Sequence, residues 1–178
     1  MPSLLLHAAE PRWQPDDAVD LVGLLQDLGL AGAEKHSDTG ETYGAGERFL
    51  SLVMFLGCSP RVLLDPQDAK PGEPVCHIRL LTFNEPTFLL AAKLPAVRCS
   101  NCRTPVEKFE SGSYDRLFSC SQCGKESELK DLDWRQAAGF GRCFIEISGI
   151  YPQEALPSDK LLDKLSDCSQ SAWKYFYI

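Results

Sequence analysis

Apolar residues in the first third of the chain recur with the spacing of helices and short strands. Residues 4–8 are mostly apolar and predict a first strand. Over 18–28 the apolar positions follow a helical period, and Gly29 is a suitable stop. Proline and negative charge suit a helix N-terminus, and they gather here as Pro15, Asp16, Asp17 and Asp20. Residues 49–56 repeat apolar side chains at i, i+3, i+4 and i+7, which predicts a second, largely buried helix. The polar stretch 35–46 predicts a surface loop.

The middle of the chain contains three apolar segments that are separated by turn residues. Residues 61–64, 76–83 and 87–90 have the length and composition of strands. Prolines and glycine within 65–72 separate the first segment from the second, and the Asn-Glu-Pro sequence at 84–86 separates the second from the third. The pattern predicts a strand meander beside the two helices.

Strand and helix signals return in the last third of the chain. Residues 143–150 alternate apolar and polar side chains, as a half-buried strand does. The Gly-Phe-Gly-Arg sequence at 139–142 fits either a bend before that strand or an exposed aromatic loop. Ser158 can cap a helix whose leucines within 161–165 face inward. Residues 173–178 predict a last strand, with the tryptophan and two tyrosines on one face and lysine, phenylalanine and isoleucine on the other.

Two short cysteine motifs lie between these strands. Cys99 and Cys102 are separated by two residues, Cys120 and Cys123 likewise, and residues 103–119 lie between the pairs. Each pair is short enough for both sulfurs to reach one ion from a tight turn, and the intervening stretch can bring the second turn opposite the first. The spacing therefore predicts four thiolates around one tetrahedral metal ion.

The segment at about residues 96–130 resembles the two knuckles of a zinc ribbon, a four-cysteine site of the rubredoxin-like kind. Gly124 follows the second pair, where a knuckle commonly needs a residue that tolerates positive φ, and Arg103 takes that place after the first pair. The resemblance implies one structural Zn²⁺, with iron as the second choice and redox-active thiols as the third. Four thiolates leave the site negatively charged, and backbone amides and nearby cations can offset that charge. The cations nearest in sequence are Arg98, Arg103 and Lys125.

Strand-like segments lie on both sides of the cysteines, so the cysteine-rich module is predicted to be an insertion. Residues 96–135 would form the zinc-ribbon insert, and residues 1–95 plus 136–178 the core domain. The whole pattern predicts an α+β fold with a mixed or antiparallel sheet, about three helices and the inserted ribbon. A chain of 178 residues is long enough to build such a core without a metal.

Charge and composition narrow the classes of partner and compartment. Lysine plus arginine number 18 against 25 acidic residues, which gives a net charge of −7 and disfavours nucleic acid as a partner. No stretch approaches the roughly 18 to 20 apolar residues that cross a bilayer, and the N-terminus lacks the features of a secretory signal. We therefore expect a soluble protein of a reducing cytoplasm, with no membrane partner, where thiols persist for metal binding.

The remaining cysteines fall at irregular spacing and are predicted to be buried free thiols. They are Cys58, Cys76, Cys143 and Cys168. Cys58 follows a predicted helix and is a candidate nucleophile, while Cys76 and His77 are candidates for its partner or for a second metal site. His7 and His36 have no evident ligand companions.

The closed set of four cysteines leaves no coordination position for water or substrate, which disfavours hydrolytic zinc chemistry. We therefore expect a zinc-binding protein that acts as a non-enzymatic interaction or assembly module, with another protein or a second copy of the chain as its partner. Two alternatives stay open. One is an enzyme that uses Cys58 or His77 in a pocket between core and ribbon, and the other is a ribbon that binds nucleic acid.

Overall fold

The computed structural model describes residues 1–36, 41–57, 62–70, 73, 75–106 and 117–178. Within these residues the chain forms α1 (Ala18–Leu28), α2 (Phe49–Leu52) and α3 (Asp159–Ser169), two short 3-10 turns and ten strands. The strands are β1 (Ser3–Ala8), β2 (Ala31–His36), β3 (Thr42–Ala45), β4 (Val53–Phe55), β5 (Ile78–Leu90), β6 (Leu117–Ser119), β7 (Glu126–Glu128), β8 (Ala138–Ser148), β9 (Ala155–Pro157) and β10 (Trp173–Tyr177). Every strand pairing in this part of the chain is antiparallel, so the predicted α+β fold is confirmed.

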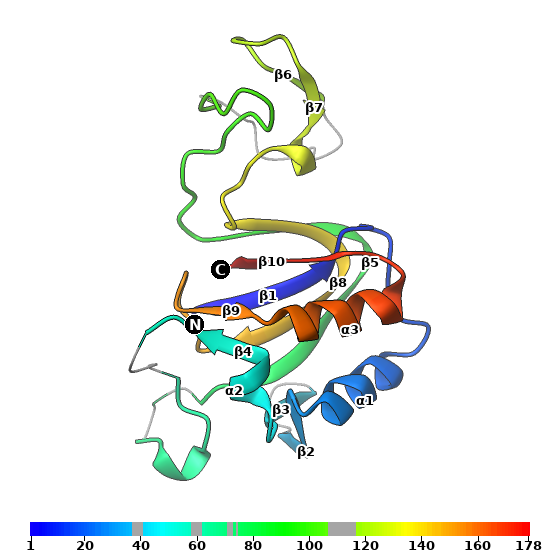
Figure 1. The fold of residues 1–178 in the computed structure, drawn as a ribbon, viewed down its shortest axis with the longest axis vertical. Coiled ribbons are helices and arrows are strands. Elements are labelled where there is room, and N and C mark those ends of the chain that lie inside the picture. Colours follow the sequence, from blue (N-terminus) through cyan, green and yellow to red (C-terminus); the bar gives the residue numbers. More distant parts are fainter. Residues whose placement is uncertain (37–40, 58–61, 71–72, 74, 107–116) are drawn as a thin grey trace.

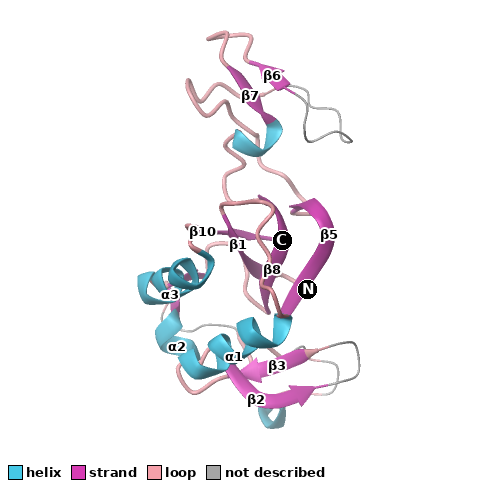
Figure 2. Ribbon diagram, turned by 90° about the vertical axis from the view of Figure 1, so that its right-hand side faces the viewer, coloured by secondary structure: helices cyan, strands magenta, loops and turns pink. Residues whose placement is uncertain are grey.

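The main sheet has six strands in the order β10-β1-β8-β5-β3-β2. Its long central ladder joins β5 to β8, from Ile78 opposite Ile147 to Leu90 opposite Ala138, with an irregularity between Thr82 and Thr87. All three helices lie on the same face of this sheet (Figures 1 and 2). The cysteine-rich insert projects beyond the end of the ladder at which β5 finishes and β8 begins.

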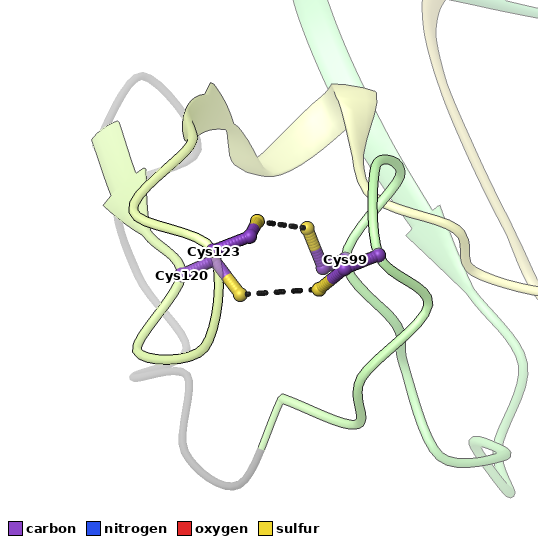
Figure 3. Close-up of side chains that lie close together, drawn as sticks. Cys99, Cys120 and Cys123 are labelled. Carbon is purple, nitrogen blue, oxygen red and sulfur yellow. Dashed lines mark hydrogen bonds between the residues drawn. The ribbon is translucent and has the colours of Figure 1, made fainter.

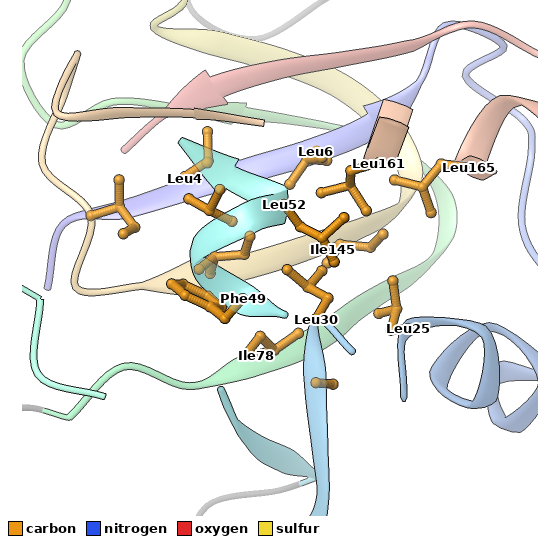
Figure 4. Close-up of a cluster of buried hydrophobic side chains, with 14 of the residues drawn as sticks. Leu4, Leu6, Leu25, Leu30, Phe49, Leu52, Ile78, Ile145, Leu161 and Leu165 are labelled. Carbon is orange, nitrogen blue, oxygen red and sulfur yellow. The ribbon is translucent and has the colours of Figure 1, made fainter. Parts of the chain in front are cut away.

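The principal core fills the space between the helices and the sheet (Figure 4). Leu4 and Leu6 of β1 and Ile145 of β8 are fully buried there, together with Leu25 of α1 and Leu161 of α3. Strand side chains alternate between faces, so this core takes every second residue of β1 and β8. Apolar burial on this scale supports a stable domain without help from a metal.

The opposite face of the sheet is also covered, by a smaller cluster around Leu5, Phe144 and Phe176. All of Cys143–Ser148 is therefore buried, whereas the alternating pattern predicted a half-buried strand. The polar residue Glu146 is accommodated because it forms an ion pair with Arg79 and its Oε1 accepts a hydrogen bond of 2.7 Å from Ser3 Oγ. A buried carboxylate needs such partners to offset the loss of hydration.

Several predicted elements are confirmed with their caps. Helix α1 begins after Asp17, whose side chain accepts a hydrogen bond from the Val19 amide, and it ends at Gly29. Helix α3 begins after Ser158, whose hydroxyl accepts from the Leu161 amide. Strands β1 and β10 are confirmed, and β10 divides its aromatic residues between the two faces as expected.

The region 31–56 differs from the prediction. The expected loop at 35–46 contains the end of β2 and all of β3, which pair as a hairpin. Thr42 and Tyr43 of β3 are buried and pair with β5. The expected helix at 49–56 stops at Leu52, because Val53–Phe55 pairs with β9 as a separate two-stranded sheet. Leu56, predicted to be buried, is 63% exposed. These pairings join segments that are distant in sequence, which the local apolar period does not encode.

Two predicted breaks in the sheet are also wrong. Residues 84–86 do not end a strand, because β5 runs through them with only a register irregularity. Residues 139–142 form neither a bend nor a loop but the first half of β8. The strand expected at 61–64 is absent from its described part, 62–64.

A separate small core joins the insert to the main sheet. Val97, Leu129, Leu132 and Trp134 are buried around Phe88 of β5, and β8 adds partly buried side chains to the same cluster. Trp134 donates its indole N–H to the Leu129 carbonyl at 2.8 Å. The insert is therefore packed onto the ends of β5 and β8. None of the helices in the described ranges has the length and apolar composition to cross a membrane.

Candidate metal centre

The first cysteine pair lies in a tight turn that is closed by two backbone hydrogen bonds. The Arg103 amide donates to the Cys99 carbonyl at 3.0 Å, and the Cys99 amide donates to the Thr104 carbonyl at 3.0 Å. This geometry requires a left-handed residue after Cys102, and Arg103 adopts φ 61. Arginine carries a steric cost in that region that glycine does not.

The second pair repeats the same turn. The Gly124 amide donates to the Cys120 carbonyl at 2.8 Å, and the Cys120 amide donates to the Lys125 carbonyl at 2.9 Å. Gly124 has φ 70, the equivalent of the strained position occupied by Arg103. Two turns of the same hydrogen-bond pattern face each other, which is the arrangement that the knuckle resemblance implied.

The four sulfurs converge between these turns (Figure 3). Cys99 Sγ lies 3.8 Å from Cys123 Sγ, and Cys102 Sγ lies 3.6 Å from Cys120 Sγ. All four sulfurs lie within 4.8 Å of one another. With a metal–sulfur distance of about 2.3 Å, the edge of a regular tetrahedron of sulfurs is about 3.8 Å, which the two printed contacts approach. The four predicted ligands form a cluster that could hold a metal ion.

Hydrogen bonds favour the ionised form of two of the four sulfurs. The pKa of Cys120 is raised instead, because the backbone hydrogen bonds that lower it are outweighed by desolvation and by its contacts with the Cys102 and Cys123 thiols. The Thr104 side chain, with Oγ1 3.3 Å from Cys102 Sγ, and the Thr104 amide lower the pKa of Cys102 to about 6. The Lys125 amide, followed by the Asn101 side chain, lowers the pKa of Cys123. Both turns thus direct the amide two residues after the second cysteine toward its sulfur. Thiolates are the form that binds metals, so these contacts favour the metal-binding form of Cys102 and Cys123.

Two of the three cations predicted to offset the charge of the site, Arg98 and Arg103, have other partners. Arg103 Nη1 lies 3.9 Å from Asp133 Oδ2, at the exposed surface. Arg98 exchanges backbone hydrogen bonds with Asp133, and its Nη1 donates to the Arg103 carbonyl at 3.4 Å. The Arg98 Nε is buried with no partner in the described part of the chain. The charge-offsetting groups that the structure places at the sulfurs are backbone amides of the two turns and the side-chain amide of Asn101.

The other candidate residues do not gather at the metal centre. Cys58 lies outside the described residues. His77 precedes β5, at the opposite end of the β5–β8 ladder from the insert, and its Nδ1 is 2.8 Å from Ser148 Oγ. It lines a cavity of about 230 Å³ that includes Cys76 and Thr42 but no insert residue. The alternative in which His77 acts in a pocket between core and ribbon is therefore wrong.

The thiols outside the cluster differ in burial. Cys76 and Cys143 are buried as predicted, and burial raises the pKa of each to about 12, so neither is a reactive thiolate at neutral pH. Cys168 was predicted to be buried but is exposed on α3. His7, for which the sequence showed no companions, lines a cavity between the core and the insert. Its only sequence signal was a polar residue inside an apolar strand.

Comparison with known proteins gives no family for this chain: no family model, no curated protein and no solved structure matches it.

Proposed function

We propose that this chain is a zinc-binding protein whose four cysteines hold one structural Zn²⁺ and so fix the insert as an interaction or assembly element. The observation that supports the metal is the sulfur cluster itself, two matched turns with sulfur–sulfur contacts of 3.6 and 3.8 Å. Four thiolates in a tetrahedron suit zinc and also iron. We propose zinc in preference to iron, because a purely structural site of four cysteines needs no redox-active metal.

A structural role follows from the ligand set. Because cysteines fill all four positions of a tetrahedron, a bound ion has no open position at which to activate water. The energy of binding then goes into holding the insert together, and in comparable peptides it is about 10 to 16 kcal/mol. The apolar cluster of the insert is small by comparison, with four buried side chains of its own around Phe88.

The interaction role rests on exposed apolar side chains. Leu117 on the insert is 62% exposed, and Leu50, Met54 and Leu56 are exposed within one short segment of the core. Exposed apolar side chains that are grouped together are typical of surfaces that contact another protein. We therefore propose another protein or a second copy of this chain as partner, in a reducing cytoplasm, and not nucleic acid.

Metal analysis of the untagged full chain tests the first half of this proposal. We expect about one equivalent of zinc. The Cys120→Ser variant should lose the metal and the hydrogen-exchange protection of amides in 97–106 and 117–135, while β1 and β8 stay protected. The matched control is Cys168→Ser, an exposed cysteine on α3, which should keep both. Less than half an equivalent of zinc, or unaltered protection in Cys120→Ser, contradicts the structural zinc.

Cross-linking and mass spectrometry in cells test the second half. Reproducible cross-links from Lys125 or Lys130 of the insert to one defined protein, or between copies of this chain, should disappear in Cys120→Ser and persist in Cys168→Ser. If the wild-type chain is monomeric at all concentrations and gives no cross-link that depends on the metal site, the interaction role is wrong.

A further inference from the structure

A cavity of about 210 Å³ lies where the insert meets the core. The core supplies one wall from the ends of β1, β8 and β10, with His7, Phe140 and Lys174 among the lining residues. The insert supplies the other wall from its returning segment, which includes Trp134 and Arg135. Pockets for drug-sized ligands measure about 300 to 1000 Å³, so this one suits a smaller molecule.

The returning segment of the insert is held at this wall by an unusual backbone. Arg135 and Gln136 both adopt left-handed conformations, with φ 52 and 59, although neither is glycine. The Gln136 carbonyl accepts a hydrogen bond of 2.9 Å from the Tyr177 amide, and the Arg135 amide donates to Asp133 Oδ1 at 3.0 Å. Consecutive residues in sparsely populated conformations persist only where the surroundings enforce them, and they cluster at functional sites.

His7 provides a neutral polar group at the core wall. Its Nδ1 lies 2.8 Å from the Ala8 carbonyl, an acceptor, so Nδ1 carries the hydrogen and Nε2 is left as the other polar atom. Its ring packs against Phe144 and Phe176 at centroid distances of 5.6 and 5.7 Å. Burial lowers the pKa of His7 to about 4, with a smaller contribution from the charge of Lys174.

Two cations at the cavity lack an ion-pair partner among the described residues. Lys174 lies directly opposite His7 in the β1–β10 ladder, so both side chains project from the same face of the sheet. Arg135 lines the cavity from the insert side. The nearby Lys130 is different, because it pairs with Glu128. Two acidic residues also line the cavity: Asp133 accepts from the Arg135 amide and lies near Arg103, and Asp131 is exposed, as Lys174 and Arg135 are.

The lining also contains an aromatic cluster. Phe88 contacts Trp134 and Phe140, with ring centroids 5.0 and 5.7 Å apart, and all three residues line the cavity. An apolar surface beside two unpaired cations is the combination that binds a flat organic group with a charged end.

We propose that this junction cavity binds a small organic anion, with its charged oxygens at Lys174 and Arg135 and its apolar part against Phe140 and Phe88. The charged oxygens belong to a carboxylate or a phosphate. Since Lys174 comes from the core and Arg135 from the insert, the anion bridges the two parts. Binding therefore depends on a folded insert, and the anion reinforces the position that the metal centre gives the insert.

Titration of the zinc-loaded full chain with benzoate, phenyl phosphate and neutral benzyl alcohol, followed by amide chemical shifts, tests this site. We expect saturable shifts of Gly139, Lys174 and Arg135 with at least one anion and none with benzyl alcohol. The anion that binds more tightly identifies the headgroup as carboxylate or phosphate. Lys174→Gln and Arg135→Gln should each weaken binding about tenfold, since each removes a charge-assisted contact.

The matched control is Lys160→Gln, an exposed lysine on α3 away from the cavity, which should bind as the wild type does. The proposal is overturned if neither anion saturates in the millimolar range. It is also overturned if benzyl alcohol binds as tightly as the anions, or if Lys174→Gln weakens binding no more than Lys160→Gln. Since these outcomes are read with zinc bound, failure here leaves the metal proposal untouched.

Discussion

Exchanging the residue that follows each cysteine pair should change zinc affinity in opposite directions. Arg103 and Gly124 occupy equivalent positions in the two turns, with φ 61 and 70 and the same backbone hydrogen bonds. Arg103→Gly relieves a left-handed arginine, whereas Gly124→Ala creates a left-handed alanine. A Cβ added at Gly124 has open space around it, so only the backbone conformation is tested there.

The magnitudes follow from two opposing terms. A left-handed L-residue costs about 1 to 2 kcal/mol, and alanine recovers about 0.4 to 1 kcal/mol of that by restricting the unfolded chain. Gly124→Ala should therefore cost about 1 kcal/mol. Arg103→Gly should gain a similar amount less the exposed ion pair with Asp133, which is worth at most about 0.5 kcal/mol. Folding of the insert and binding of the ion are linked, so these energies correspond to zinc binding about fivefold weaker and about twofold tighter, respectively.

Competition with a chromophoric chelator at fixed pH measures both constants on the same scale. The double variant Arg103→Gly with Gly124→Ala should lie between the single variants, because the two turns do not share hydrogen bonds. The reasoning is refuted if both single substitutions weaken zinc binding, or if Gly124→Ala is indistinguishable from the wild type. In either case the left-handed residue would not determine the zinc affinity of the site.

Two further predictions concern the core. Gly139→Ala should destabilise the chain by about 1 to 3 kcal/mol, because the added Cβ would overlap the Phe176 ring. The control Gly23→Ala, which has open space on α1, should stabilise the chain by about 0.5 to 1 kcal/mol. If the urea midpoints of the two variants move in the same direction, this reasoning is contradicted. His7 binds its proton more weakly in the folded chain, with a pKa lowered to about 4 by burial, so its contribution to stability is complete above pH 6.5 and is lost as the pH falls toward 4. The loss is at most about 3 kcal/mol. Urea unfolding between those pH values should be less pH-dependent in His7→Gln than in the wild type, and equal slopes would refute the buried neutral imidazole.

Local patterns in the sequence were sufficient for the cysteine cluster and for the best-capped helices. Spacing alone predicted the clustering of Cys99, Cys102, Cys120 and Cys123. A two-residue gap within each pair fixes a tight turn, and two such turns can bring four sulfurs around one ion. Helix α1 was found because its apolar period, its cap and its stop agree.

The long-range pairings were beyond the sequence pattern. Phe49–Leu52 and Val53–Phe55 share one helical apolar period, yet the second segment becomes a strand because β9 is available to pair with it. Residues 84–86 contain a proline and still lie inside β5, where a register irregularity accommodates them.

Sequence by itself determined the cluster of four cysteines, the α+β class and the opposite faces of β10, because each depends on spacings of a few residues. Tertiary structure alone decided that residues 139–142 continue β8 and that His7, Lys174 and Arg135 share one cavity. Those outcomes depend on the path of the chain through the sheet and on the angle at which the insert meets it. Contacts between residues far apart in sequence set both, and no local period records them.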